Sequence, residues 1–445
     1  MKKIFFLLFI LLMANGQWSM VNGQTFAITT DNVTLLATPD EVGEMMFSGG
    51  NLSIGDTVID VTTISSMTYS AANFDPLLVD VQYSAQGGNV TMPLSLADSI
   101  WVERDGAYVT ITSAKKGGAE VVYTLSGTTA DGGFNQVGEY KCKVRLNGVN
   151  ITSQRGAAVH IKNGKRIDID VANGTVNTFV DHADTLHDAC FHVKGHPEFF
   201  GMGTINITGK GRHAYKSGEY TELKDSLGTI NILAAPADGM HVGQYFKMKG
   251  GTVNVRNGVK GDGIQVECNS DSTKEYNGQL FLRNGSVNIE ISGDSCEGLK
   301  CDSLLTISGG THNVACGGLF SKCLKAGTYM VMYEKKSTPV VTLTNTGGYV
   351  TYMEGKTEKH KKSVCLKVEQ DFFFHKGTLK LTADEDIKGK SANIGGDYVF
   401  VSKAISLTAS PAIDVDGAIR TMSDESKIIA REQAKGIYIS MLEEE

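Results

Sequence analysis

The chain has 445 residues, a formal net charge of −7 at pH 7, and 51 glycines against 7 prolines. Because there is no basic excess to replace the counterions of a phosphate backbone, the charge argues against nucleic acid as a partner. Abundant glycine without a collagen period favours tight turns between short strands. No apolar run beyond residue 23 is long enough for a transmembrane helix.

Residues 1–23 have the pattern of a cleavable signal peptide. Lys2 and Lys3 precede an apolar run at residues 4–13, which is too short to span a bilayer. Small residues follow, with Gly23 directly before the expected cleavage point. We therefore expect the protein to be exported and to be secreted, periplasmic or displayed on the cell surface.

Residues 24–105 are expected to form a β-rich N-terminal region, because short alternating segments there are separated by glycines. This region is either a small domain or a cap. A cap is useful because the open end of a strand stack exposes an unpaired, aggregation-prone sheet edge. At the other end, residues 421–445 lie beyond the repeats described next and are expected to form a C-terminal tail or cap.

Residues 106–420 contain a repeated phrase, Gly-Thr/Ser-apolar-Asn-apolar, as at 251–255 and 285–289. Its asparagine position recurs at Asn177, Asn206, Asn231, Asn254, Asn288 and Asn313, with Lys380 in the same place. The shortest gaps are 25 (206 to 231) and 23 (231 to 254). An interval of about 24 residues holds three short strands and three turns, which predicts an all-β fold, a parallel β-helix. Leucine-rich repeats need a leucine framework that is absent, and propeller blades need about 40 residues or more.

A second phrase gives two core-facing columns and one outward column, because side chains alternate across a strand and equivalent residues of successive coils stack about 4.8 Å apart. The outward column contains His160, His192, His241, Gln265, Lys300, Lys325 and Lys367. We predict that the residues of this column from His192 to Lys367 bind a carboxylate-bearing sugar chain. An ordinary solvated sheet face is the alternative. A metal site on its histidines is not expected, because ligands on a flat sheet do not converge on one ion.

Carboxylates stand beside this column at a turn of consecutive coils, at Asp238, Asp262 and Glu297, with Asp294 just upstream of Glu297. Stacked carboxylates repel one another, and Ca²⁺ takes such oxygen ligands together with backbone carbonyls. We therefore predict one or more calcium sites here. The alternative is ordinary Asp-Gly turn chemistry.

The asparagine column is expected to form a ladder of side-chain hydrogen bonds, with sugar binding as the alternative. The eight cysteines are expected to be packed thiols, because Cys190, Cys323 and Cys365 share one repeat position. The alternative is disulfides, for which the closest pairs in sequence are Cys296 with Cys301 and Cys316 with Cys323.

The chain resembles a family of exported bacterial carbohydrate-binding domains with a polysaccharide-lyase-like right-handed parallel β-helix. The residues that carry the resemblance are 146–153, 156–159, 167–177, 261–264 and 305–311, and it extends over roughly 106–420. It implies a calcium-containing β-helix that binds plant-type or acidic polysaccharides, with Asp262 as the best calcium ligand. Because of insertions near 195–225 and 327–362, the resemblance does not define where a binding groove would end.

Three functions follow as alternatives. The first is a secreted, non-catalytic polysaccharide-binding β-helix, acting as a monomer with bound calcium. The second is a calcium-dependent polysaccharide lyase of the pectate type, in which Lys300 or Lys325 would take the C5 proton of a uronate while calcium neutralises its carboxylate. The third is a structural or adhesive surface β-helix. No isolated cluster of basic and acidic residues singles out a catalytic centre.

Overall fold

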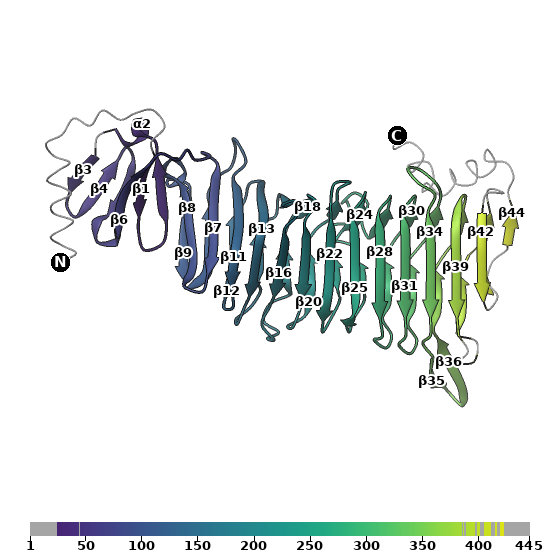
Figure 1. The fold of residues 1–445 in the computed structure, drawn as a ribbon. Helices are drawn as coiled ribbons and strands as arrows, with labels where there is room; N and C mark the ends of the chain where they lie inside the picture. Colours follow the sequence, from purple (N-terminus) through teal and green to yellow (C-terminus); the bar gives the residue numbers. More distant parts are fainter. Residues whose placement is uncertain are drawn as a thin grey trace.

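Parallel strands stack into a long β-helix in this computed structural model (Figure 1). The structure describes residues 25–43, 45–384, 386, 389–396, 398–400, 405–410, 414–415 and 419–421. The expected signal peptide and all but the first residue of the expected C-terminal tail therefore lie outside the described residues. Among the helices in the described ranges, none has the length and apolarity needed to cross a membrane.

Each coil takes one strand from each of three faces. Face 1 comprises β15 (Arg166–Val171), β18 (His196–Phe200), β21 (Thr221–Leu223), β24 (Tyr245–Met248), β27 (Gln279–Leu282), β30 (Leu305–Ile307), β33 (Met330–Met332), β38 (Phe372–Phe374), β41 (Tyr398–Phe400) and β44 (Ile419–Thr421). Face 2 comprises β16 (Val176–Val180), β19 (Thr204–Thr208), β22 (Thr229–Ala235), β25 (Thr252–Val259), β28 (Ser286–Ile291), β31 (Thr311–Cys316), β34 (Val340–Asn345), β39 (Gly377–Ala383) and β42 (Ile405–Ser410).

Face 3 comprises β10 (Ala107–Ser113), β12 (Gly132–Gly138), β14 (Val159–Lys162), β17 (Ala189–Val193), β20 (His213–Ser217), β23 (Met240–Val242), β26 (Ile264–Val266), β29 (Glu297–Cys301), β32 (Lys322–Ala326), β37 (Val364–Val368), β40 (Lys390–Ile394) and β43 (Asp414–Val415). Faces 1 and 2 merge near the N-terminal end, because the long strand β13 (Cys142–Thr152) pairs with both β15 and β16. The expected three-strand coil is confirmed.

The core consists of columns of apolar side chains from alternate strand positions. Met240, Ile264 and Leu299 are at most 1% exposed and pair in register across β23, β26 and β29. In these coils, the residue directly before each of these three core side chains must be small. A Cβ atom built on Gly263 would lie 2.5 Å from the carbonyl oxygen of Gly298, closer than packed atoms approach. Burial of one large apolar side chain stabilises the fold by about 1.5–3 kcal/mol, so repeating columns give the stack its cohesion.

The cysteines are packed thiols, as expected. All eight are free; seven are buried and Cys268 is exposed. Cys323 and Cys365 occupy equivalent places in β32 and β37, since Leu324 pairs with Leu366 on the next position. Neither of the two disulfides considered from the sequence is formed.

Face 2 carries the asparagine ladder, which confirms its structural role. Each side-chain amide donates to the one before it: Asn231 to Asn206 at 2.8 Å, Asn254 to Asn231 at 2.8 Å, Asn288 to Asn254 at 3.0 Å and Asn313 to Asn288 at 3.0 Å. One assignment was wrong. Asn177 pairs with Ile205, one place out of register, and is buried, where it accepts the amide N–H groups of Gly148 and Val149.

Asn254→Ala is expected to lower the free energy of unfolding by about 1–2 kcal/mol, because each lost hydrogen bond costs about 1 kcal/mol. This side chain makes two ladder bonds, whereas Asn313 donates one. Asn313→Ala is therefore the matched control, with about half the loss. Chemical denaturation of both variants measures the difference. Equal losses would show that the ladder bonds do not contribute.

The N-terminal region covers the first coils. β1 (Thr25–Thr29) pairs antiparallel with β2 (Thr34–Ala37) and β6 (Ser66–Ser70), and the short helix α2 (Pro39–Val42) follows β2. A separate antiparallel sheet contains β3 (Met45–Ser48), β4 (Asn51–Ile54) and β5 (Thr57–Asp60). β9 (Ile100–Asp105) closes the edge of face 3 by antiparallel pairing with β10.

The boundary of this region is less sharp than the sequence suggested. β7 (Leu78–Ser84) already pairs in parallel with β11 (Val122–Thr129), while β8 (Gly87–Pro93) pairs antiparallel with β7. The first coil therefore begins inside the expected cap. A strand edge that is already paired within the molecule cannot pair with a strand of another molecule.

The two expected insertions differ from each other. Residues 195–225 are not an insertion, because they form the regular strands β18 to β21. In 327–362, by contrast, a hairpin of β35 (Tyr349–Glu354) and β36 (Thr357–Lys362) projects from the stack (Figure 1). The polar segment between β26 and β27 contains no strand, in agreement with a loop.

Candidate functional site

The outward column of face 3 is in register as expected. Backbone pairing aligns His160, His192, Lys216, His241, Gln265, Lys300, Lys325 and Lys367. Lys216 of β20 was missed. The residue after it, Ser217, is polar but fully buried in a core position, where its hydroxyl donates to the Glu219 carbonyl oxygen at 2.7 Å. A serine in an apolar column hid this coil from the pattern.

The charges of this column are largely neutralised by neighbours. Lys300 Nζ lies 3.4 Å from Asp262 Oδ2, Lys367 Nζ 3.2 Å from Glu369 Oε2, and Lys216 Nζ 2.9 Å from Asp188 Oδ2. In the described part of the chain, Lys325 is the lysine of this column without a carboxylate partner. The column as a whole therefore offers a polyanion little uncompensated charge.

The two N-terminal histidines of the column are uncharged at neutral pH. The rings of His160 and His192 stack at 4.7 Å. Burial, and then the charge of the other ring, lowers the pKa of His160 to about 4. Burial, followed by the charge of Lys216, lowers the pKa of His192 to about 4 as well. These rings can donate hydrogen bonds to sugar hydroxyls but do not attract carboxylates.

The carboxylates Asp238, Asp262 and Glu297, here called the carboxylate column, form a chain of hydrogen bonds. Asp238 Oδ1 accepts the Asp262 amide N–H at 2.9 Å, and Asp262 Oδ1 accepts the Glu297 amide N–H at 2.7 Å. Glu297 Oε1 lies 2.8 Å from Lys322 Nζ. All three residues are buried. Asp294 differs: it is exposed in a turn, and its Oδ1 accepts the Leu319 amide N–H at 2.8 Å.

These contacts do not suit a calcium ion. Ca²⁺ needs six to eight oxygen ligands, whereas the oxygens of Asp262 and Glu297 already face backbone N–H groups and the ammonium groups of Lys300 and Lys322. A calcium ion would have to displace both lysines and would be repelled by them. The turn chemistry considered as the alternative accounts for the observed bonds.

The environments of Asp262 and Asp238 shift the pKa values of their carboxyl groups in opposite directions. Burial, and then the charge of Glu297, raises the pKa of Asp262 to about 7. At Asp238, burial opposes ionisation, but the contacts of its carboxylate with the imidazoles of His213 and His241 outweigh it and hold the pKa well below its usual range. Asp238 therefore carries the fixed negative charge of the column.

The raised pKa of Asp262 predicts a pH-dependent stability. Between its unfolded pKa of about 3.9 and its folded pKa, the native state holds a proton that the unfolded state releases, so this carboxyl lowers stability as pH rises, by up to about 1.4 kcal/mol per pH unit. Asp262→Asn should therefore gain stability relative to the wild type between pH 4 and pH 7.

The measurement is the difference in free energy of unfolding between variant and wild type at pH 4.5 and pH 7.5, in which buried histidines titrating over this range cancel. Asp294→Asn is the control, because that side chain is exposed. A difference that does not change with pH would contradict the assignment.

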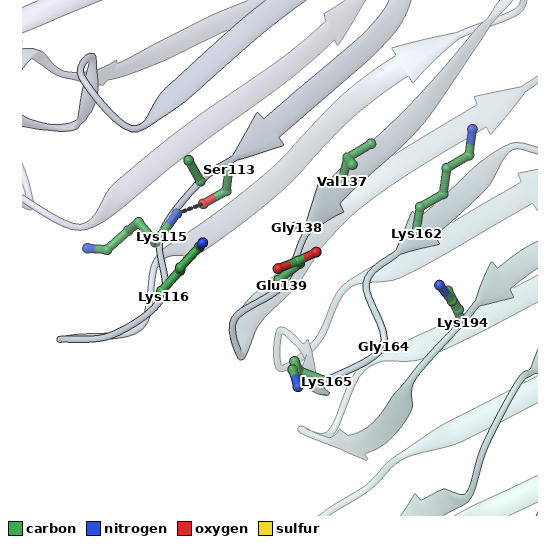
Figure 2. Close-up of a pocket in the computed structure, with 11 residues that line it drawn as sticks. Ser113, Lys115, Lys116, Val137, Gly138, Glu139, Lys162, Gly164, Lys165 and Lys194 are labelled. Atoms are coloured by element: carbon green, nitrogen blue, oxygen red, sulfur yellow. Dashed lines mark hydrogen bonds between the residues drawn. The ribbon is translucent and has the colours of Figure 1, made fainter.

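An uncompensated basic surface lies in the N-terminal coils instead. Loops that follow β10, β12, β14 and β17 line a cleft of about 750 Å³ (Figure 2). Its charged residues, which define the basic cleft, are Lys115, Lys116, Lys162, Lys165, Lys194 and Glu139. Five ammonium groups and one carboxylate give it a formal charge of +4. Within the described residues, none of these five lysines is ion-paired with a carboxylate, and four of them are exposed.

On face 3, the position just after the second core residue of each strand carries a different charge in the N-terminal coils than in the later coils. Lys162 and Lys194 hold this place in β14 and β17 and follow the paired residues Ile161 and Val193. In later coils the same place is held by Gly218, Gly243, Glu267, Asp302, Gly327 and Glu369. The N-terminal coils therefore present cations where the later coils present glycine or a carboxylate.

Comparison with known proteins agrees with a glycan-binding surface. A family model described as carbohydrate-binding domain-containing protein matches residues 105–404. This chain belongs to that family. A carbohydrate-binding domain-containing protein of Acetivibrio thermocellus is 25% identical over 228 residues, covering 42% of this chain and 73% of that relative. A solved polysaccharide lyase-like protein from C. thermocellum aligns with 59% of this chain and 96% of its own, at 18% identity and a TM-score of 0.45.

For a family that binds carbohydrate, exposed aromatic rings are a second possible platform. Face 1 carries a group of aromatic rings, but these rings pack on one another. Tyr220 and Tyr245 stack at 4.6 Å with 7° between their planes, and Tyr245 is 9% exposed. The Tyr220 hydroxyl donates to Glu198 Oε1 at 2.9 Å. These ring faces are used within the fold and offer little free area to a sugar.

A second hollow, of about 630 Å³, lies near β7, β11 and β13. Its lining contains both signs of charge, with Lys143 and Arg145 opposite Asp75, Asp80 and Asp170. Because these charges compensate, the hollow suits a polyanion less well than the basic cleft. Sequence reasoning missed the basic cleft, although the lysines after Ile161 and Val193 were a readable signal.

Proposed function

We propose that this protein binds acidic polysaccharides in the basic cleft, without a chemical step. The observation that carries the proposal is a formal charge of +4, from five lysines without carboxylate partners, on a chain with a net charge of −7. Membership of a carbohydrate-binding family supports a glycan as the ligand. Clefts of one sign on a protein of the other sign attract and orient charged ligands.

Neighbouring coils suit a polymeric ligand. Lys162 and Lys194 repeat at the strand spacing of about 4.8 Å, so a glycan with one carboxylate per sugar can meet them in succession. The stacked rings of His160 and His192 lie on the same strands and offer neutral hydrogen-bonding groups beside these cations. The lysines of the cleft would bind the charged groups of a sugar chain, and the His pair would bind its hydroxyl groups.

The test is a glycan array and a pull-down with insoluble glycans, each run with and without Ca²⁺. We expect retention on polyuronates or other anionic glycans, little retention on neutral cellulose-type chains, and release by salt, because exposed charge pairs are screened. Retention on neutral glycans alone would refute the basic cleft as the site. Binding to no glycan would leave the third alternative, a structural or adhesive β-helix.

A polysaccharide lyase is supported less well. Its base must be unprotonated near neutral pH. At Lys300 burial lowers the pKa, but the charges of Asp262 and Glu297 outweigh it and raise the pKa above the usual lysine value. Lys300 therefore remains a cation at neutral pH. Ultraviolet absorbance of unsaturated uronates on incubation with polygalacturonate would establish a lyase; we expect none.

The calcium sites predicted from the sequence are not part of this proposal. Because Lys300 and Lys322 already neutralise the carboxylate column, we expect a chelator to leave the thermal unfolding midpoint within about 1 °C of its value in calcium, where loss of 1 kcal/mol would move it about 2–4 °C. Magnesium serves as the control cation. A fall of several degrees on chelation, restored by calcium but not magnesium, would show a structural calcium ion.

Export is part of the proposal, since a polysaccharide ligand of this kind lies outside the cell. The signal-peptide pattern of residues 1–23 supports it. N-terminal sequencing of the protein recovered from its native host should begin at Gln24. A start at Met1 in the cytoplasmic fraction would contradict it.

A further inference from the structure

Two imidazoles and a carboxylate converge on face 3 at the N-terminal end of the carboxylate column. They belong to His213 of β20, Asp238 in the turn before β23, and His241 of β23. Asp238 Oδ2 lies 3.3 Å from His213 Nδ1 and 3.0 Å from His241 Nδ1. One potential ligand atom of each residue lies within 4.8 Å of the others. Ligand atoms of a tetrahedral zinc ion, with bonds of about 2.0–2.1 Å, are about 3.3 Å apart.

The other contacts of the two rings indicate where their protons lie. His241 Nδ1 donates to Asp238 Oδ2 at 3.0 Å, because an ionised carboxylate can only accept, and His241 Nε2 lies 3.2 Å from Glu267 Oε2. His213 Nδ1 accepts the Asp238 amide N–H at 3.2 Å, which places the ring proton on Nε2. Without a metal ion, the Nδ1 proton of His241 therefore lies between that nitrogen and Asp238 Oδ2, while His213 Nδ1 uses its lone pair to accept the Asp238 amide N–H. A metal ion at this point would take the place of that proton and would bind both Nδ1 atoms and Asp238 Oδ2.

The surroundings match a metal centre in a further respect. Metal-binding histidines usually donate their second ring N–H to a carboxylate, which orients the ring and raises its basicity. Glu267 Oε2, 3.2 Å from His241 Nε2, is placed for this role once a metal ion holds Nδ1, and Gln265 Nε2 in turn donates to Glu267 Oε1 at 2.5 Å. The nearby ammonium group of Lys216 is neutralised by Asp188 at 2.9 Å. It therefore does not oppose a cation at the cluster.

We propose that His213, Asp238 and His241 bind one borderline divalent cation of the zinc type, with water as a fourth ligand. Imidazole nitrogen selects zinc, nickel or copper over calcium, which prefers oxygen alone. The side chains of the three residues are 8%, 13% and 14% exposed, so an ion can reach them from solvent. Binding would replace the amide hydrogen bond at His213 Nδ1 and would tie the coil of β20 to the coil of β23.

The proposed site departs from the expectation that histidines on a flat sheet do not converge on one ion. His241 belongs to the outward column, but His213 comes from a different column, three residues before Lys216. Asp238, placed at a turn, reaches between them. The rings of His213 and His241 lie 4.5 Å apart with 35° between their planes. The site is independent of the basic cleft and of the proposed glycan.

The experiment titrates Zn²⁺ alone into the full mature chain, without an affinity tag, in competition with a chromogenic chelator. Cys268→Ser is used as the background, because Cys268 is the exposed thiol among the eight. We expect one tightly bound equivalent, a weakening of at least tenfold in His241→Gln and in His213→Gln, and no change in His192→Gln, a histidine of the same outward column two coils away. Millimolar Ca²⁺ should not compete.

A second readout separates ligand loss from misfolding. Co²⁺ in the wild-type site should give the strong visible absorption of a tetrahedral centre, and Zn²⁺ should raise the thermal unfolding midpoint of the wild type but not of His241→Gln. Variants are first compared without metal by circular dichroism. Equal zinc affinity in His241→Gln and the wild type, displacement of zinc by calcium, or no bound equivalent in the wild type would each overturn the proposal.

Discussion

Reversing the charge of Lys162 and Lys194 together is expected to weaken binding of an anionic glycan by at least tenfold, which corresponds to about 1.4 kcal/mol. The double variant Lys162→Glu/Lys194→Glu changes the formal charge of the basic cleft from +4 to zero. Both side chains are exposed and make no ion pair within the described residues, so little stability should be lost. Affinity is measured by titration with an oligouronate, and folding by thermal unfolding.

The control is Lys300→Gln/Lys367→Gln, in the outward column that the sequence singled out. Because Lys300 is paired with Asp262 and Lys367 with Glu369, we expect these two substitutions to change glycan affinity less than twofold. The two variants remove cations from the same face of the same helix. If the control weakened binding more than the charge reversal did, the glycan would lie along the outward column and not in the basic cleft.

Removing Lys322 is expected to cost about 3–5 kcal/mol of stability, because loss of one partner leaves a buried charge uncompensated. The side chains of Lys322 and Glu297 are each 9% exposed, with Nζ and Oε1 2.8 Å apart. Lys322→Met would leave Glu297 facing Asp262, and their mutual repulsion would add to the desolvation cost. Chemical denaturation and the thermal unfolding midpoint measure the loss.

Two further variants make this prediction specific. Lys322→Met/Glu297→Gln removes the stranded charge and should recover most of the lost stability. Lys336→Met breaks an exposed pair with Asp225, whose side chains are 52% and 59% exposed, and should cost less than about 1 kcal/mol. The interpretation fails if Lys322→Met is no more harmful than Lys336→Met.

The fold was predictable because its information is local and repeated. A strand unit with Asn at its outward position, as at Asn231 and Asn254, fixes both the alternation and the register, and backbone pairing confirms it. Where a coil departs from the pattern, the prediction failed. Ser217 in a core position hid the coil of Lys216, and Asn177 was placed one residue out of register because its side chain bonds inward.

The site was less predictable because charge compensation is a property of the folded surface. The sequence showed Lys300 and Lys367 in one column but not that Asp262 and Glu369 neutralise them. Repeat columns also say nothing about loops. The basic cleft collects residues such as Lys116 and Lys165 from loops that follow different strands and share no repeat position (Figure 2).

The most direct test of an acidic ligand in the basic cleft compares one polymer with and without its charge. The measurement is the ratio of the dissociation constants of the wild-type chain for methyl-esterified and free polygalacturonate, determined by titration at low salt. We predict that esterification weakens binding at least tenfold and that the ratio falls toward one in Lys162→Glu/Lys194→Glu. Equal affinity of the wild type for both polymers would contradict recognition of acidic glycan by these lysines.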